Sequence, residues 1–179
     1  MGGSFSRVVL LDLYFAVLSS LACSPGETRI CVGAVLVRER DDDRRNASPL
    51  VLLGRREAGR AFYPDVWDVL GGHLEPGETT EQALVRELRE EAGVTPTAWH
   101  SLGEFREPLP DGDGSLVLHL YAVTDWTGVP RNRSPEEHAE VSWFAVEDAC
   151  RLALAHPAYP ALLRRVASGT STTEREGYA

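Results

Sequence analysis

The sequence predicts an α/β fold for most of a chain of 179 residues. Apolar, β-branched runs at 30–37 and 50–53 have the composition of buried strands. At 80–92 the pattern becomes helical, with Thr79 suited to the N-cap and Gln82 completing a capping box. A chain of this length forms one domain with room for short tails.

The same two patterns, apolar runs for strands and helical spacing for helices, predict the remaining elements. Further strands are predicted at 66–70, 99–105, 115–123 and 141–145, and further helices at 146–155 and 158–166. No internal repeat is visible in the sequence. We therefore divide the chain into an N-terminal extension (1–29), one domain (30–167) and a Ser/Thr/Gly-rich tail expected to be disordered (168–179).

The charge balance excludes several classes of function. All 18 basic side chains are arginine, 27 side chains are acidic, and the net charge is −9. Excess acid argues against binding a nucleic-acid polymer, whose affinity rests on basic residues. The lack of lysine excludes a Walker phosphate loop and Schiff-base chemistry, since both require an amine.

The cysteines and the N-terminus favour a cytoplasmic location. Cys23, Cys31 and Cys150 contain no CxxC pair and suggest neither a disulfide framework nor a zinc site. The apolar run at 8–22 is too short to span a bilayer and contains Asp12. A weak similarity to a secretory or lipoprotein signal is the competing interpretation of this run.

The helix at 80–92 carries an acidic face. Glu87, Glu90 and Glu91 are spaced i, i+3 and i+4, so their carboxylates share one side, while Leu84 and Leu88 lie beside that side. In a cleft such carboxylates repel by as much as about 4 kcal/mol per pair. A hard divalent cation, Mg²⁺ or Mn²⁺, relieves that repulsion.

The loop before the helix favours a site over a merely solvated acidic face. Glycines 71–72 allow close backbone approach, and the turn at 76–77 brings Glu78 back toward the helix. Arg86 can orient a carboxylate through its planar fork. In the alternative interpretation, Arg86 and Arg89 are only intrahelical partners of an exposed acidic surface.

Residues 72–94 match the Nudix signature G-x5-E-x7-R-E-U-x-E-E-x-G-U, where U is apolar, at every fixed position. Those positions are filled by Gly72, Glu78, Arg86, Glu87, Leu88, Glu90, Glu91, Gly93 and Val94. Segments 33–37, 67–72 and 140–144 also look like the flanking elements of Nudix domains. The resemblance, closest to the MutT-type branch, covers 29–166.

The resemblance implies a Nudix fold, in which a mixed β-sheet lies between helices as an α/β/α sandwich. It also implies a Mg²⁺-dependent hydrolase, with Mn²⁺ as a possible substitute, that cleaves a phosphoanhydride in a nucleoside triphosphate or other nucleoside diphosphate derivative and releases a nucleoside monophosphate. The expected partner is a small nucleotide, with no nucleic-acid polymer and no membrane. The protein is expected to be a monomer or homodimer.

By position, the resemblance assigns roles to the box residues. The implied metal ligands are Glu87, Glu90, Glu91 and the backbone carbonyl of Gly71. One of the three glutamates also acts on the attacking water. Glu87 and Glu90 are assigned catalytic roles, and Glu87 is our first choice as the general base. Glu78 and Arg86 form the pair that braces the loop on the helix.

A further carboxylate ligand is expected from the loop before the strand at 141–145. Glu137 is the first choice by its spacing to that strand, and Glu140 is the second. His73 and His138 could touch phosphate, but we interpret both as having no chemical role.

The sequence constrains the identity of the substrate less than it constrains the type of reaction. The branch that hydrolyses oxidised guanine nucleotides often uses an asparagine near the last helix, where this chain has His156. Its only asparagines are Asn46 and Asn132, which argues against that specificity. Pro110, at a spacing typical of one subgroup, makes an ADP-ribose or nucleotide-sugar pyrophosphatase the alternative. The aromatics Phe62, Tyr63 and Trp126 are candidates for stacking a base, although packing is the favoured role of each.

Two other classes share the predicted fold. Isopentenyl diphosphate isomerases need a catalytic cysteine, and neither Cys31 nor Cys150 lies in an obvious loop motif. Non-catalytic nucleotide sensors tend to have damaged boxes, whereas every carboxylate of this box is present. Hydrolysis is therefore the leading hypothesis.

Overall fold

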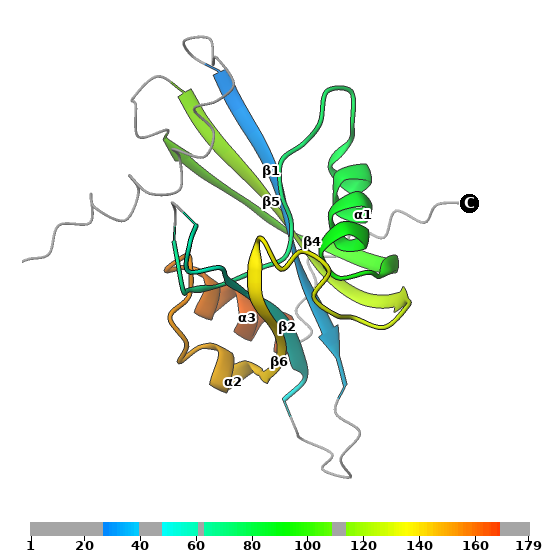
Figure 1. Ribbon diagram of the computed structural model, residues 1–179, viewed down its shortest axis with the longest axis vertical. Coiled ribbons are helices and arrows are strands. Elements are labelled where there is room, and N and C mark those ends of the chain that lie inside the picture. Colours follow the sequence, from blue (N-terminus) through cyan, green and yellow to red (C-terminus); the bar gives the residue numbers. More distant parts are fainter. Residues whose placement is uncertain (1–26, 40–47, 61–62, 109–113, 169–179) are drawn as a thin grey trace, which may run out of the picture.

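The structure, a computed structural model, describes residues 27–39, 48–60, 63–108 and 114–168. These residues form a mixed six-stranded sheet with helices on both faces (Figure 1). The predicted α/β/α fold class is confirmed.

The helices and strands, in chain order, are β1 (Glu27–Arg38), β2 (Leu50–Arg56), β3 (Trp67–Asp68), α1 (Thr80–Glu91), β4 (Thr95–Pro108), β5 (Gly114–Thr127), β6 (His138–Ala145), α2 (Val146–Ala149) and α3 (Tyr159–Ala167). The strand order is β3-β2-β1-β5-β4. Strand β6 also pairs with β2, outside this linear order. Strands β1 and β5 run parallel, and the other pairs are antiparallel.

Strand β1 supplies both layers of the core because successive side chains of a strand point to opposite faces. Val32 and Leu36 face α1 and pack in one cluster with Leu84 and Leu88 of that helix. Val35 faces the other way, into the cluster that includes buried side chains of α3. Each helix layer therefore buries its apolar stripe on one face of the same sheet.

Helix α1 begins and ends as its sequence predicts. The Thr79 side chain accepts a hydrogen bond from the Gln82 amide, and the Gln82 side chain accepts one from the Thr79 amide, which completes the capping box. Gly93 has φ of +70°, the left-handed conformation that ends many helices. These two ends fix the register of the acidic face.

Two predicted elements are shorter than expected. The helix predicted at 146–155 stops at Ala149, because residues 153 and 155 instead form backbone hydrogen bonds with Trp67. The strand predicted at 66–70 is reduced to β3, because the chain turns toward β1, where Leu70 accepts a hydrogen bond from Ala34. In both cases tertiary backbone pairing overrides the local pattern.

Several features named from the sequence lie outside the described residues: Cys23, Asn46, Phe62, Pro110, the apolar run at 8–22 and the tail beyond 168. Strand β1 starts at Glu27, within the segment predicted as an extension. The division into three segments stays a prediction. No helix among the described residues combines the length and apolar character needed to cross a membrane.

Candidate active site

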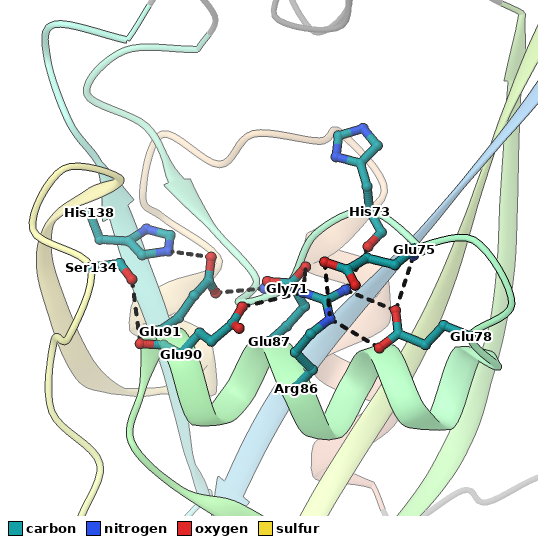
Figure 2. A network of polar contacts seen from close by, with 10 residues as sticks. All are labelled: Gly71, His73, Glu75, Glu78, Arg86, Glu87, Glu90, Glu91, Ser134 and His138. Carbon is teal, nitrogen blue, oxygen red and sulfur yellow. Dashed lines mark hydrogen bonds and ion pairs between the residues drawn. The ribbon is translucent and has the colours of Figure 1, made fainter. Parts of the chain in front are cut away.

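The acidic face of α1 lies against the glycine turn that follows β3 (Figure 2). The Gly71 amide donates a 2.8 Å hydrogen bond to Oε2 of Glu91, and the Gly72 carbonyl accepts one of 2.9 Å from Val32. A Cβ on Gly71 would lie 2.2 Å from the Val32 carbonyl oxygen, and a Cβ on Gly72 would lie 2.3 Å from Oε1 of Glu87. The backbone of the turn therefore requires glycine at Gly71, and Gly72 leaves space for the Glu87 carboxylate.

Arg86 is the centre of the polar network. Its Nε and Nη2 each donate a 3.0 Å hydrogen bond to a different oxygen of Glu78, and Nη2 also donates to the His73 carbonyl at 2.8 Å. Its Nη1 lies 2.8 Å from Glu87 and 3.3 Å from Glu90. One side chain thus ties the loop at 73–78 to the acidic face of the helix (Figure 2).

The carboxylates of α1 are in different electrostatic environments. Burial raises the pKa of Glu87 to about 7, against the hydrogen bond from Arg86, and the charges of Glu91 and Glu90 raise it further. Burial also raises the pKa of Glu91, against the lowering effects of His138 and the Gly71 amide, and the charge of Glu137 acts in the same direction as burial. The hydrogen bond from Arg86 lowers the pKa of Glu78. Burial therefore disfavours the ionised form of both Glu87 and Glu91.

The side chains of the acidic face are of the chemical type that binds a hard divalent cation. Among the described residues, no three His, Cys, Asp or Glu side chains converge closely enough to hold a metal ion. Two carboxylates, from Glu87 and Glu90, nevertheless converge on the single cationic nitrogen Nη1 of Arg86. Carboxylate oxygens are the ligands preferred by Mg²⁺, and the space beside Gly72 keeps the Glu87 carboxylate next to the turn.

The two candidate loop ligands are in different places. Glu137 ends the loop before β6, and its charge acts on Glu91; its Oε2 lies 3.3 Å from Nη2 of Arg60. Glu140 lies within β6, where it contacts Arg55 at 3.8 Å and accepts a hydrogen bond from Ser142. The charge of Glu137 thus acts on Glu91, whereas the contacts of Glu140 are to residues of β2 and β6.

His138 contacts this face although the sequence suggested no role for it. Its ring is 3% exposed, and Nε2 lies 3.2 Å from Oε1 of Glu91, at ion-pair distance but outside hydrogen-bond geometry. No sequence pattern distinguishes this histidine from one in a hydrated loop. His73, the other histidine considered, contributes its backbone carbonyl to Arg86 and has an exposed side chain.

The candidate substrate-reading residues lie apart from each other. Trp126 stacks on Trp143, with ring centroids 5.9 Å apart, against the core under α1. The Asn132 amide bonds within its own loop, to the His138 carbonyl and the Ser134 amide. His156 stacks on Phe105 at 4.9 Å. Tyr63 is half-buried, with a positive φ of 47°.

The fold and this acidic site define a family. A family model described as NUDIX domain matches residues 27–166. The chain belongs to the Nudix family, and the predicted signature, fold and enzyme class are confirmed. The chain is a Nudix hydrolase, MutT proteins are among its structural neighbours, and members of this family generally use divalent metal ions.

Individual relatives show the range of the family. The chain is 34% identical over 114 residues to the CTP pyrophosphohydrolase of Escherichia coli (strain K12), covering 63% of this chain and 78% of that protein. It is 31% identical over 170 residues to diphosphoinositol polyphosphate phosphohydrolase 3-beta of Bos taurus, covering 89% and 95%. A crystal structure of a MutT NUDIX hydrolase from Burkholderia pseudomallei matches with a TM-score of 0.61 and 26% identity, over 78% of this chain and 98% of that one.

Proposed function

We propose that this enzyme is a divalent-metal-dependent pyrophosphohydrolase that cleaves a nucleoside triphosphate or another nucleoside diphosphate derivative and releases a nucleoside monophosphate. The observation that carries the proposal is the convergence of Glu87 and Glu90 on one cationic nitrogen, with Glu91 anchored to the Gly71 amide beside them. Glu87, Glu90, Glu91, the Gly71 carbonyl and Glu137 would hold the cation, Mg²⁺ or Mn²⁺.

Each residue of the site has a definable task. A bound cation neutralises the pyrophosphate and lowers the pKa of a coordinated water. Glu87 would accept the proton of the attacking water on its carboxylate, as the first choice for the general base. Arg86 and Glu78 hold the loop at 73–78 on the helix, so that the Gly71 and Gly72 backbone keeps its position.

A nucleotide is favoured over a more highly charged substrate. The chain has no lysine and a net charge of −9, whereas an inositol polyphosphate requires many cationic contacts. The described residues offer no free asparagine amide beside α3, since that of Asn132 is engaged in its own loop. We therefore do not assign specificity for oxidised guanine. ADP-ribose remains the alternative substrate class.

Product analysis on a substrate panel tests the proposal. The purified chain is incubated with CTP, dGTP, 8-oxo-dGTP, ADP-ribose, NADH, a dinucleoside polyphosphate and a diphosphoinositol polyphosphate, each with Mg²⁺, Mn²⁺ or excess chelator. We expect a nucleoside monophosphate from at least one nucleotide, only when metal is present. Cleavage of none of them with either metal contradicts the proposal, and exclusive cleavage of the inositol compound refutes the substrate class. Location in the cytoplasm and the state of monomer or homodimer stay predictions.

A further inference from the structure

His138 is a buried polar side chain without a hydrogen bond. Both ring nitrogens, Nδ1 and Nε2, are inaccessible to solvent and have no hydrogen-bond partner among the described residues. Buried polar groups are nearly always satisfied, so a histidine left in this state has a reason to be there. The carboxylate of Glu91 lies close to the ring, with Oε1 3.2 Å from Nε2.

The loop before β6 fixes the position of His138. The amide of His138 donates to the Ser134 carbonyl at 2.9 Å, and its carbonyl accepts from the Asn132 side chain. The same loop is docked on the end of α1, where the Arg133 amide donates to the backbone carbonyl of Glu91 at 2.8 Å. The loop therefore holds the imidazole and the helix end as one unit (Figure 2).

Gly54 of β2 makes the space that the imidazole occupies. A Cβ at Gly54 would lie 2.6 Å from Nδ1 and 2.9 Å from Cε1 of His138, distances that real Cβ atoms do not show. Strand β2 thus presents a bare backbone on one side of the ring, and Glu91 lies on the other. The ring cannot move away from Glu91 in the direction of β2.

The Glu91 carboxylate is consequently held at both oxygens. The Gly71 amide contacts Oε2 at 2.8 Å, and Nε2 of His138 lies 3.2 Å from Oε1. Glu90, one residue earlier, has a side chain that is 59% exposed, and one of its oxygens lies 3.3 Å from Nη1 of Arg86. The Glu91 carboxylate is therefore more preorganised than the exposed carboxylate of Glu90.

We propose that His138 is a positioning residue that, backed by Gly54, holds the Glu91 carboxylate in the orientation needed to bind the metal ion. This inference rests on the proposed function, because it assigns Glu91 to the metal site. Partners that orient a metal ligand commonly change metal affinity by about 10–100-fold when they are removed. His138 touches the ligand and not the substrate, so it acts on metal affinity more than on the chemical step.

A matched pair of amide variants tests the role. In His138→Gln the side-chain nitrogen is as many bonds from Cα as Nε2 of histidine, so it can still reach Glu91. In His138→Asn the nitrogen is one bond nearer the backbone and falls short. Binding of Mn²⁺ to the full chain is measured by the loss of the free-ion electron paramagnetic resonance signal, and folding is measured by thermal unfolding in chelator.

We expect His138→Asn to bind Mn²⁺ about tenfold more weakly, or worse, with His138→Gln within about threefold of wild type. The Mn²⁺ concentration for half-maximal activity should rise in parallel, while kcat at saturating Mn²⁺ changes far less. Equal Mn²⁺ affinities of folded wild type and His138→Asn overturn the inference. If His138→Asn does not fold, a folded His138→Gln with affinity tenfold below wild type overturns it.

Gly54→Ala provides an independent test from the other side of the ring. Its methyl group must displace the imidazole, so we expect weaker Mn²⁺ binding, whereas Gly59→Ala, with no atom within 4 Å of the added Cβ, should bind as wild type does. Full Mn²⁺ affinity in a folded Gly54→Ala contradicts the role of His138. Absence of Mn²⁺ binding in the wild type is a different result, because it overturns the proposed metal site itself.

Discussion

Arg86 and Glu78 face each other in a two-point contact, with Nε to Oε1 and Nη2 to Oε2 both at 3.0 Å. The pair joins the loop before α1 to the middle of that helix. Because the guanidinium is planar and rigid, this contact also sets the direction of Nη1, which contacts Glu87. The position of the acidic face therefore depends on a residue two helical turns from the helix start.

Arg86→Lys should lower activity on the order of tenfold or more and should also lower the melting temperature. Lysine keeps the positive charge but cannot contact Glu78 at two points while also reaching Glu87 and the His73 carbonyl. Steady-state kinetics and thermal unfolding in chelator measure the two effects. Arg89→Lys, on the exposed side of α1, is the matched control, and equal losses in both variants would show that the fork geometry is unimportant.

Glu87→Gln should reduce kcat by about 10²–10⁴-fold, because the amide cannot accept a proton. The fold should persist, since glutamine preserves the shape of the side chain beside Gly72. Glu104→Gln on β4 removes the same charge from a strand that contributes nothing to the site and should retain wild-type kcat. Retained turnover by Glu87→Gln would falsify its role as the general base, and retention by both Glu87→Gln and Glu91→Gln would contradict the metal-dependent mechanism.

The contribution of Glu87 to the stability of the metal-free protein should fall as pH rises from about 4.5 to about 7. The pKa of Glu87 is raised in the folded state to about 7, so the folded state binds more protons than the unfolded state in this window. The contribution of Glu87 is therefore fully present below its unfolded pKa and is lost as pH passes its folded pKa. Its size is at most about 3 kcal/mol.

Urea unfolding at a series of pH values, with chelator present, measures this slope in wild type and Glu87→Gln. The slope should be shallower in Glu87→Gln, because that titrating group is gone, and Glu104→Gln should keep the wild-type slope. Identical slopes in wild type and Glu87→Gln would show that burial does not raise this pKa.

Mg²⁺ should stabilise the protein, by about 3 kcal/mol when free metal is near 100 times its dissociation constant. The proposed site exists only in the folded chain, which holds Glu87, Glu90 and Glu91 on one helix face. Thermal unfolding with Mg²⁺ and with chelator measures the shift, which should shrink in Glu90→Gln and persist in Glu104→Gln. A shift of equal size in Glu90→Gln would show that Glu90 does not bind the metal.

Gly72→Ala should affect activity much more than stability. The added Cβ would lie 2.3 Å from Oε1 of Glu87, and a carboxylate at the end of a flexible side chain can move away. The displaced carboxylate then no longer lies beside the glycine turn, so activity should fall on the order of tenfold or more. Kinetics and thermal unfolding are compared with Gly59→Ala, whose Cβ meets no atom. Wild-type activity in Gly72→Ala would mean that Glu87 is not needed in its observed place.

Elements dominated by local interactions were predictable. The capping box of Thr79 and Gln82 and the positive φ of Gly93 follow from residues a few positions apart, and the structure has both. The helix predicted at 146–155 was wrong beyond Ala149 because backbone groups of residues 153 and 155 pair with Trp67, far away in the sequence. A local window contains no information about that partner.

The candidate site also combines features that the sequence predicts with features that it does not. The spacing of Glu87, Glu90 and Glu91 puts them on one helix face whatever the rest of the chain does. Their different environments could not be predicted, because Glu91 is buried by the loop before β6 while Glu90 stays exposed. The place of His138 depends on that loop and on Gly54 of β2, two segments that no sequence pattern connects.

The sequence by itself determined the family, the helix that carries the acids and the pairing of Arg86 with Glu78, since all of these lie within one segment of continuous signature. Tertiary structure decided which carboxylate is buried, which loop acid comes near it, and what contacts its second oxygen. The physical reason is that helix periodicity is a property of neighbouring residues, whereas burial and the pKa values that follow from it depend on what the rest of the fold packs against them.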